Sequence, residues 1–189
     1  MTEAKQKIQR LSRLLKVAFF IAACSLPILT AGYWVSNGYP FLKPWMYWNE
    51  MPEISMQGVY IKPIMEMDGG VKFLAFLVSL IPTSISVVAL LFLAKLFRSY
   101  EQLEIFSKTS VQCLRKIGYC VVLNQLIHPF YYALMSLTVT FSNPPGQRMV
   151  AVAVGPEQVK FLVVGASILL ISWVMEEGRK LQEEQEATV

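Results

Sequence analysis

A short series of polar side chains lies within the third apolar stretch of the sequence, residues 117–141. Asn124 and His128 are four residues apart, so on a helix they stack one turn above the other. Tyr131 and Tyr132 flank them, and His128 is the only histidine in the chain. An imidazole can hold or pass a proton near neutral pH, and polar groups deep in a membrane usually face the protein interior. These four residues are therefore a candidate site for a ligand or a proton.

A structural role for the same residues is the alternative. Pro129 follows His128 and leaves the carbonyl of Gln125, one turn earlier, without its helical donor. A neutral histidine bonded to that carbonyl, to Asn124 or to a tyrosine hydroxyl would join helices instead of binding a ligand. Hydroxyl side chains of the second apolar stretch are candidate partners: Ser79, Thr83 and Ser86.

Other chemistry has little support in the sequence. The three cysteines, Cys24, Cys113 and Cys120, lack the spacing of metal ligands, and the acidic residues between 50 and 68 lack the alternation of a calcium loop. No aspartate or glutamate lies within an apolar stretch, so paired carboxylates are not available there. We therefore predict no catalytic residue, no metal and no cofactor, and expect that the protein is not an enzyme.

Four apolar stretches must position these residues: 14–35, 71–97, 117–141 and 159–175. About 20 apolar residues are needed to span a bilayer as a helix. The 189 residues are 54% hydrophobic and 16% charged, against about 25% charged in soluble domains. We predict an all-α integral membrane bundle of four transmembrane helices, with residues 1–189 forming a single membrane domain. The first helix is expected to remain uncleaved, with Tyr33 and Trp34 as an aromatic anchor at the interface.

The distribution of lysine and arginine predicts the orientation of the spans. Counted together with the adjoining ends of the apolar stretches, the segments before the first stretch, between the second and third, and after the fourth carry 12 of the 17, and the other two connections carry 5. Positive residues concentrate on the cytoplasmic side, so both termini, the middle loop 98–116 and the tail 176–189 are predicted to be cytoplasmic. The net charge of +4 then reflects contact with the lipid bilayer, and we expect no direct binding of nucleic acid.

The two remaining loops are predicted to lie outside. The first, of roughly 35 residues between 36 and 70, is rich in aromatic residues such as Trp45 and Trp48, which are expected at the outer membrane interface. The second, residues 142–158, contains Asn-Pro-Pro-Gly at 143–146, which is typical of a turn.

Two segments of the chain resemble a known family. The first is YEQLEIFSKTSVQCLRKIGY, and the second is the C-terminal EEGRKLQEEQEATV. Their order and spacing resemble the bacterial domain-of-unknown-function 2975 membrane-protein family, from the second span to the last residue. The matching positions are Tyr100, Glu101, Phe106, Leu114, Arg115, Ile117, Gly118, Gly178, Leu181, Glu183, Glu184, Thr188 and Val189.

The resemblance implies a multi-pass protein of the bacterial cytoplasmic (inner) membrane, with a helix-turn-helix transcription factor as a possible partner. The leading hypothesis is a non-enzymatic sensor or regulator that engages a cytoplasmic DNA-binding protein through its middle loop and tail. The candidate docking residues are Tyr100, Glu101, Phe106, Arg115, Gly118, Gly178, Leu181, Glu183, Glu184 and Val189.

A small transporter, or a subunit of a larger membrane complex, is the alternative function. It would use the polar intramembrane site around His128. Four spans are few for a transporter that acts alone, so this alternative requires a homo-oligomer or other subunits.

Overall fold

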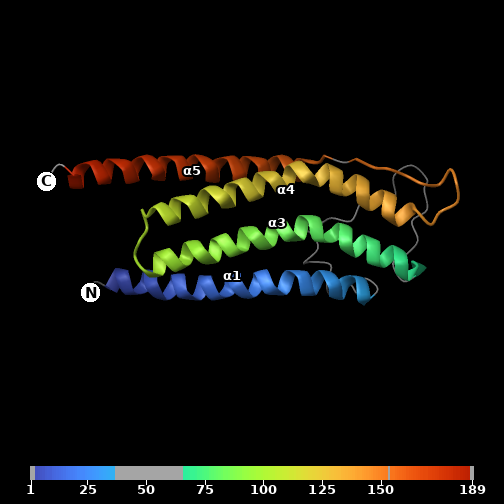
Figure 1. Ribbon diagram of the computed structural model, residues 1–189, viewed down its shortest axis with the longest axis horizontal. Helices are drawn as coiled ribbons and strands as arrows, with labels where there is room; N and C mark the ends of the chain where they lie inside the picture. Colours follow the sequence, from blue (N-terminus) through green and yellow to red (C-terminus); the bar gives the residue numbers. More distant parts are fainter. Residues whose placement is uncertain (1–2, 37–65, 153, 188–189) are drawn as a thin grey trace. The chain divides into compact units, whose positions relative to one another are not determined.

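The computed structural model of the protein describes residues 3–36, 66–152 and 154–187. These residues form four helices without strands: α1 (Glu3–Val35), α3 (Gly69–Glu101), α4 (Lys108–Thr140) and α5 (Pro156–Ala187) (Figure 1). All four are long and apolar enough to cross a membrane. The prediction of four apolar helices is therefore confirmed, and the chain is a multi-pass membrane protein. Most of the predicted aromatic outer loop, residues 37–65, lies outside the described residues.

Each helix is longer than the membrane interior that it has to cross. The helices contain 33, 33, 33 and 32 residues. At 1.5 Å per residue this is about 50 Å, whereas the hydrocarbon core of a bilayer is about 30 Å thick. The extra length of each helix is formed by charged sequence next to the apolar stretch. Much of the connection 98–116 is therefore helical rather than loop, and the tail is helical up to Ala187.

Most hydroxyl side chains in the apolar helices bond to their own helix. Ser79 donates to the carbonyl of Ala75 at 2.8 Å, and Thr83 donates to that of Ser79 at 2.7 Å. This bonding to the preceding turn satisfies a hydroxyl without a second helix. The same pattern holds for Thr30, Ser84, Ser136, Thr138, Thr140, Ser167 and Ser172.

The short connection between α3 and α4 begins with a defined C-cap. The backbone N–H of Glu104 donates to the carbonyl of Ser99, and that of Leu103 donates to Tyr100, both at 3.0 Å. This pair of bonds is a Schellman motif, in which the residue after the cap adopts a left-handed conformation. Leu103 occupies that position with φ of 63°.

The connection ends with an N-cap on α4. The Ser107 hydroxyl accepts the backbone N–H of Ser110 at 3.2 Å, which satisfies one of the free donors in the first turn. The Ser110 hydroxyl in turn donates to the carbonyl of Glu104 at 2.8 Å. Both helix ends are therefore closed by hydrogen bonds within the connection.

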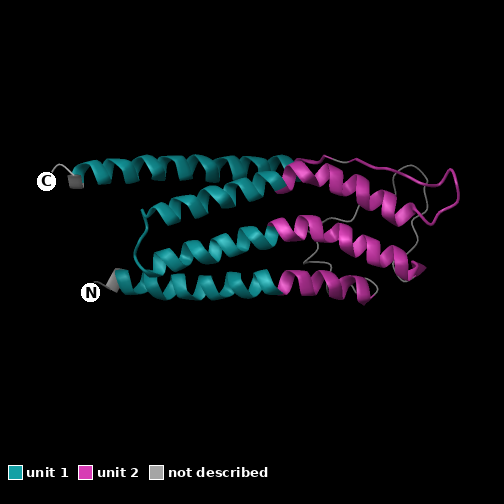
Figure 2. Ribbon diagram, viewed as in Figure 1, with its two compact units in different colours: residues 1–24, 86–123, 157–189 teal, residues 25–85, 124–156 magenta. Residues whose placement is uncertain are grey.

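The chain divides into two compact units (Figure 2). Unit 1 contains residues 1–24, 86–123 and 157–189, and unit 2 contains residues 25–85 and 124–156. The helices α1, α3 and α4 each contribute to both units, and α5 belongs to unit 1 from its second residue. A single membrane domain over the whole chain stays a prediction.

Within unit 1, α1 and α3 pack in opposite directions. Phe19 stacks on Phe97 with ring centroids 5.5 Å apart, and the earlier residue Gln9 reaches the later residue Glu101. Next to this pair, Leu96 of α3 forms a buried cluster with Cys113 and Ile117 of α4. Cys113, which lies within the predicted middle loop 98–116, is thus a buried residue of α4.

Two glycines bring α4 and α5 close together in unit 1. A Cβ on Gly118 would lie 2.7 Å from Leu169 Cδ2, and a Cβ on Gly165 would lie 2.7 Å from Val122 Cγ2. Each helix therefore presents a glycine to a branched side chain of the other. Small residues allow membrane helices to approach in this way and gain van der Waals contact.

We expect Gly165→Leu to lower the free energy of unfolding by about 1–3 kcal/mol, because overpacking displaces Val122 and its backbone. The measurement is the thermal unfolding midpoint of the detergent-solubilised protein. The matched control is Gly178→Leu, since a Cβ at Gly178 has no heavy atom within 4 Å. Equal midpoints for the two variants would contradict the close packing of α4 on α5.

Candidate functional site

Unit 2 contains a buried core of aromatic and apolar side chains from α1, α3 and α4. Its members include Tyr33, Trp34, Val71, Ala75, Tyr131, Met135 and Val139. Trp34 is only 3% exposed and donates from its indole nitrogen to the Ser79 hydroxyl at 3.2 Å. Tyr33 and Trp34 therefore pack inside the protein, unlike the interfacial anchor that the sequence suggested. The Trp34–Ser79 bond joins α1 to α3 at the predicted polar site.

The four predicted residues of the polar site lie together on α4. Asn124, His128 and Tyr131 are 8%, 5% and 0% exposed, and Tyr132 is partly buried. The His128 ring lies 6.0 Å from the Tyr131 ring and 5.5 Å from the Tyr132 ring, measured between centroids. The helical spacing thus places one imidazole against two phenols, with Asn124 one turn earlier.

Two polar atoms of this site are buried and have no hydrogen-bond partner among the described residues. They are the Asn124 amide oxygen Oδ1 and the Tyr131 hydroxyl. Tyr131 interacts electrostatically with Ser79, but no hydrogen bond of normal geometry joins them. A buried polar group without a partner costs about 1–3 kcal/mol, and more in a medium without water. A polar molecule or water that bonds to either atom would therefore be stabilised here.

Of the three hydroxyl residues predicted as partners of the polar site, two lie in unit 2 and one lies in unit 1. Ser79 and Thr83 are buried in unit 2, and Thr83 is satisfied by the carbonyl of Ser79. Ser86 belongs to unit 1. No group of three metal-binding side chains occurs in the described part of the chain. The chemistry available around His128 is hydrogen bonding and proton exchange.

Three of the predicted docking residues hold unit 1 together. Tyr100 packs against the Leu96 cluster and edge-on to Phe97, with ring centroids 5.8 Å apart. Glu101 accepts from Lys16 Nζ at 2.5 Å and from Arg13 Nε at 2.8 Å, which ties α1 to the end of α3. Gly118 lies against α5. The contacts of these three residues within the protein are enough to explain why they occur in the sequence, so a docking role is not needed to explain them.

Glu101 lies four residues after the apolar stretch that ends at Phe97, outside the part of α3 expected in lipid. The hydrogen bonds from Lys16 and Arg13 lower the pKa of its carboxyl group. A lowered pKa means that the ion pair stabilises the fold above the ordinary glutamate pKa and is lost as the pH falls below it. At neutral pH, therefore, Glu101 remains charged and the contact is present.

The other docking candidates are more accessible. Phe106 and Leu181 are 53% and 56% exposed, Gly178 and Glu184 are exposed, and Glu183 pairs with Arg179. Arg115 is half-buried on α4 near the end of α5, where it interacts with Glu176. Val189 lies outside the described residues.

Trp173 and Lys180 lie near Arg115 but are not among the residues predicted from the sequence. A tryptophan at the end of an apolar stretch is a recognisable signal, so Trp173 could have been found.

A family model identifies the protein family to which this chain belongs. The family described as "Protein of unknown function (DUF2975)" matches residues 23–189. The chain belongs to this family. The match includes α1 only from residue 23 onward, and all of α3, α4 and α5, so it covers both the polar site and the docking candidates. No curated protein and no solved structure gives a significant match.

Membership of the DUF2975 family confirms the resemblance seen in the two sequence segments. The segment around Tyr100–Gly118 includes the end of α3, the capped connection and the start of α4. Several of its matching residues have structural contacts, as described above. In the described part of the segment from Glu176 onward, the ion pairs of Arg179 and Lys180 join residues of α5 to one another, and Leu181 and Gly178 are exposed.

We expect Tyr131→Phe to raise the free energy of unfolding by about 1 kcal/mol, because it removes a buried hydroxyl that has no partner. Thermal unfolding in detergent measures the change. Tyr119→Phe is the control, since Tyr119 is 58% exposed. A lower midpoint for Tyr131→Phe would show that the hydroxyl is bonded to water or a ligand in the native protein.

Proposed function

We propose that this DUF2975 protein is a non-enzymatic membrane sensor or regulator that holds a cytoplasmic protein through the end of α5. The observation that carries the proposal is an exposed apolar position within a charged helix. Leu181 is 56% exposed and lies seven residues after Val174, on the same helical face. Gly178 lies between them, with open space where a side chain would be. A partner helix could approach the backbone closely at this point.

The orientation is part of the proposal. The charged ends of all four helices belong to unit 1, and these ends contain most of the lysine and arginine of the chain. We place unit 1 toward the cytoplasm because positive residues concentrate there. The membrane is then the bacterial cytoplasmic membrane that the family resemblance implies.

The charge of the tail favours a basic partner. The segment 176–189 has five glutamates and two basic residues, a difference of three negative charges. Arg179 is engaged by Glu176 and Glu183 within the helix. Glu184 is exposed and faces the same side as Leu181. A helix-turn-helix regulator, which carries basic residues for DNA, fits this acidic and apolar surface.

One helix connects the two candidate sites. Asn124, His128 and Tyr131 lie on α4, which also carries Gly118 at the contact with α5. A ligand that satisfied the Asn124 and Tyr131 atoms would favour one packing of α4 over another. A shift of α4 would then change the support of α5 and the presentation of Leu181.

We expect Leu181→Arg to reduce recovery of the partner about tenfold or more, because one apolar interface anchor is commonly worth over 1 kcal/mol. The measurement is cross-linking in native cells, purification of the full chain in mild detergent and quantitative mass spectrometry. Gln182→Arg adds the same charge one residue away, on another face. Equal recovery of a DNA-binding protein with both variants would contradict docking at Leu181.

A small transporter, or a subunit of a membrane complex, is the second candidate function. The buried Asn124 and Tyr131 atoms without partners favour it, since a transported polar solute needs such groups at membrane depth. Liposomes containing the full chain should then show solute or proton flux that His128→Ala reduces at least about tenfold. Tyr119→Phe should leave the flux unchanged. Flux that is absent, or equal in the His128 variant, would contradict transport through this site.

A further inference from the structure

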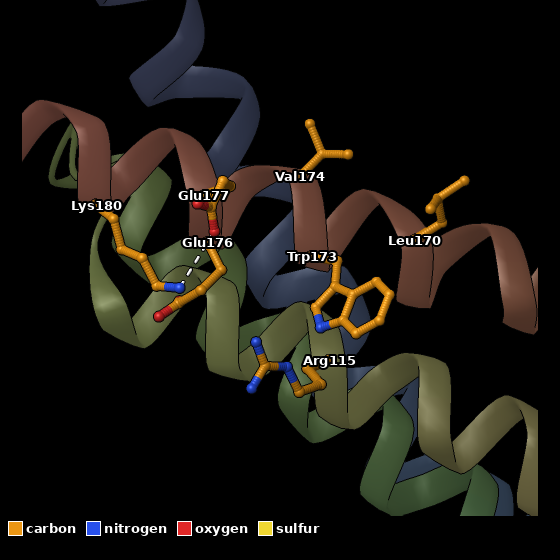
Figure 3. Close-up of a pocket in the computed structure, with 7 residues that line it drawn as sticks. All are labelled: Arg115, Leu170, Trp173, Val174, Glu176, Glu177 and Lys180. Carbon is orange, nitrogen blue, oxygen red and sulfur yellow. Dashed lines mark hydrogen bonds and ion pairs between the residues drawn. The ribbon is translucent and has the colours of Figure 1, made fainter.

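Unit 1 contains an open pocket of about 490 Å³ between α4 and α5. This volume is within the usual range for a site that binds a small molecule. Its lining combines apolar and charged side chains: Arg115, Leu170, Trp173, Val174, Glu176, Glu177 and Lys180. Figure 3 shows Trp173 of α5 directed toward Arg115 of α4, with Glu176 and Lys180 beyond them.

The pocket lies where both helices change from apolar to charged sequence. Arg115 and Lys116 precede the apolar stretch that begins at residue 117, and Trp173 lies two residues before the fourth stretch ends at Met175. Tryptophan, arginine and lysine at such a boundary are typical of the membrane–water interface. This composition favours a position of the pocket at the level of the lipid headgroups in one leaflet.

Arg115 is the charged group of the pocket that lacks a direct partner in the described part of the chain. Lys180 pairs with Glu177 at 3.2 Å, and Glu176 is held by Arg179 at 2.9 Å. Arg115 interacts with Glu176 electrostatically, but among the described residues it makes no hydrogen bond or close ion pair. A guanidinium has five N–H donors in a fork that suits phosphate oxygens. The pocket thus offers donors for an anion.

The apolar side of the pocket suits a hydrocarbon chain. Leu170, Trp173 and Val174 are 61%, 71% and 66% exposed, and they form one exposed surface on α5. The two carboxylates nearby disfavour an anion with two negative charges, such as a phosphate monoester or inorganic phosphate. A phosphodiester carries one charge, and in a phospholipid it is joined to acyl chains.

We propose that this pocket binds one membrane glycerophospholipid, with its phosphodiester on Arg115 and an acyl chain along Leu170, Trp173 and Val174. The ligand would bridge α4 and α5 beside their glycine contact. It would stabilise the base of the tail that extends from the membrane.

The test adds dioleoyl phosphatidylglycerol to the full chain in detergent and measures the bound lipid by native mass spectrometry. We expect Arg115→Gln to weaken binding about tenfold, because it removes a charge-assisted contact to phosphate. Lys116→Gln is the matched control, since it removes the same charge from the next residue, which lies over the Phe92 ring instead. An equal effect of both variants, or no effect of Arg115→Gln, would overturn the site.

Two further arms distinguish lipid binding from misfolding and from binding of free phosphate. Trp173→Leu should also weaken binding, and this residue is too exposed for its loss to unfold the protein, so it remains informative if Arg115→Gln misfolds. A large excess of inorganic phosphate should not displace the lipid, and displacement would assign the site to free phosphate instead. Leu181→Arg should bind lipid normally, so loss of partner docking and loss of lipid binding are distinguishable.

Discussion

The thickness of the bilayer controls the arrangement of this protein, because each helix is about 50 Å long and the hydrocarbon core is only about 30 Å thick. The apolar stretches match the core, and the charged ends must continue beyond it as helix. Those ends then need contacts outside the lipid. Glu101 with Lys16 and Arg13, and Arg179 with Glu176 and Glu183, supply such contacts in unit 1.

The sequence predicts the helices well because the signal for a span is long and strongly apolar. It also places Asn124, His128 and Tyr131 together, since helical spacing is enough to do so. It does not reveal that Trp34 donates to Ser79, because that pairing depends on how α1 packs against α3. For the same reason, the contact of Gly118 with Leu169 could not be read from either segment alone.

The two units use different means to hold helices together. Unit 1 combines ion pairs at the helix ends with close packing at Gly118 and Gly165. Unit 2 has a large aromatic core with a polar site inside it, where two atoms have no partner among the described residues. Unit 1 is therefore closely packed at its glycines, whereas unit 2 contains two polar atoms that a ligand could bond. In native proteins the large majority of buried polar atoms have a hydrogen-bond partner, so these two atoms are unusual.

The hydroxyl groups that bond to their own preceding turn have a consequence for biogenesis. A helix that satisfies its serines and threonines internally can leave the translocon for lipid before any neighbour has arrived. The second and fourth spans carry such hydroxyls at Ser79, Thr83, Ser167 and Ser172. The third span also bonds Ser136 and Thr138 to its own preceding turn, but it differs in carrying the Asn124 amide oxygen, which has no partner among the described residues. Synthesis would therefore favour a third span that stays near the protein already inserted, and assembly would begin around it.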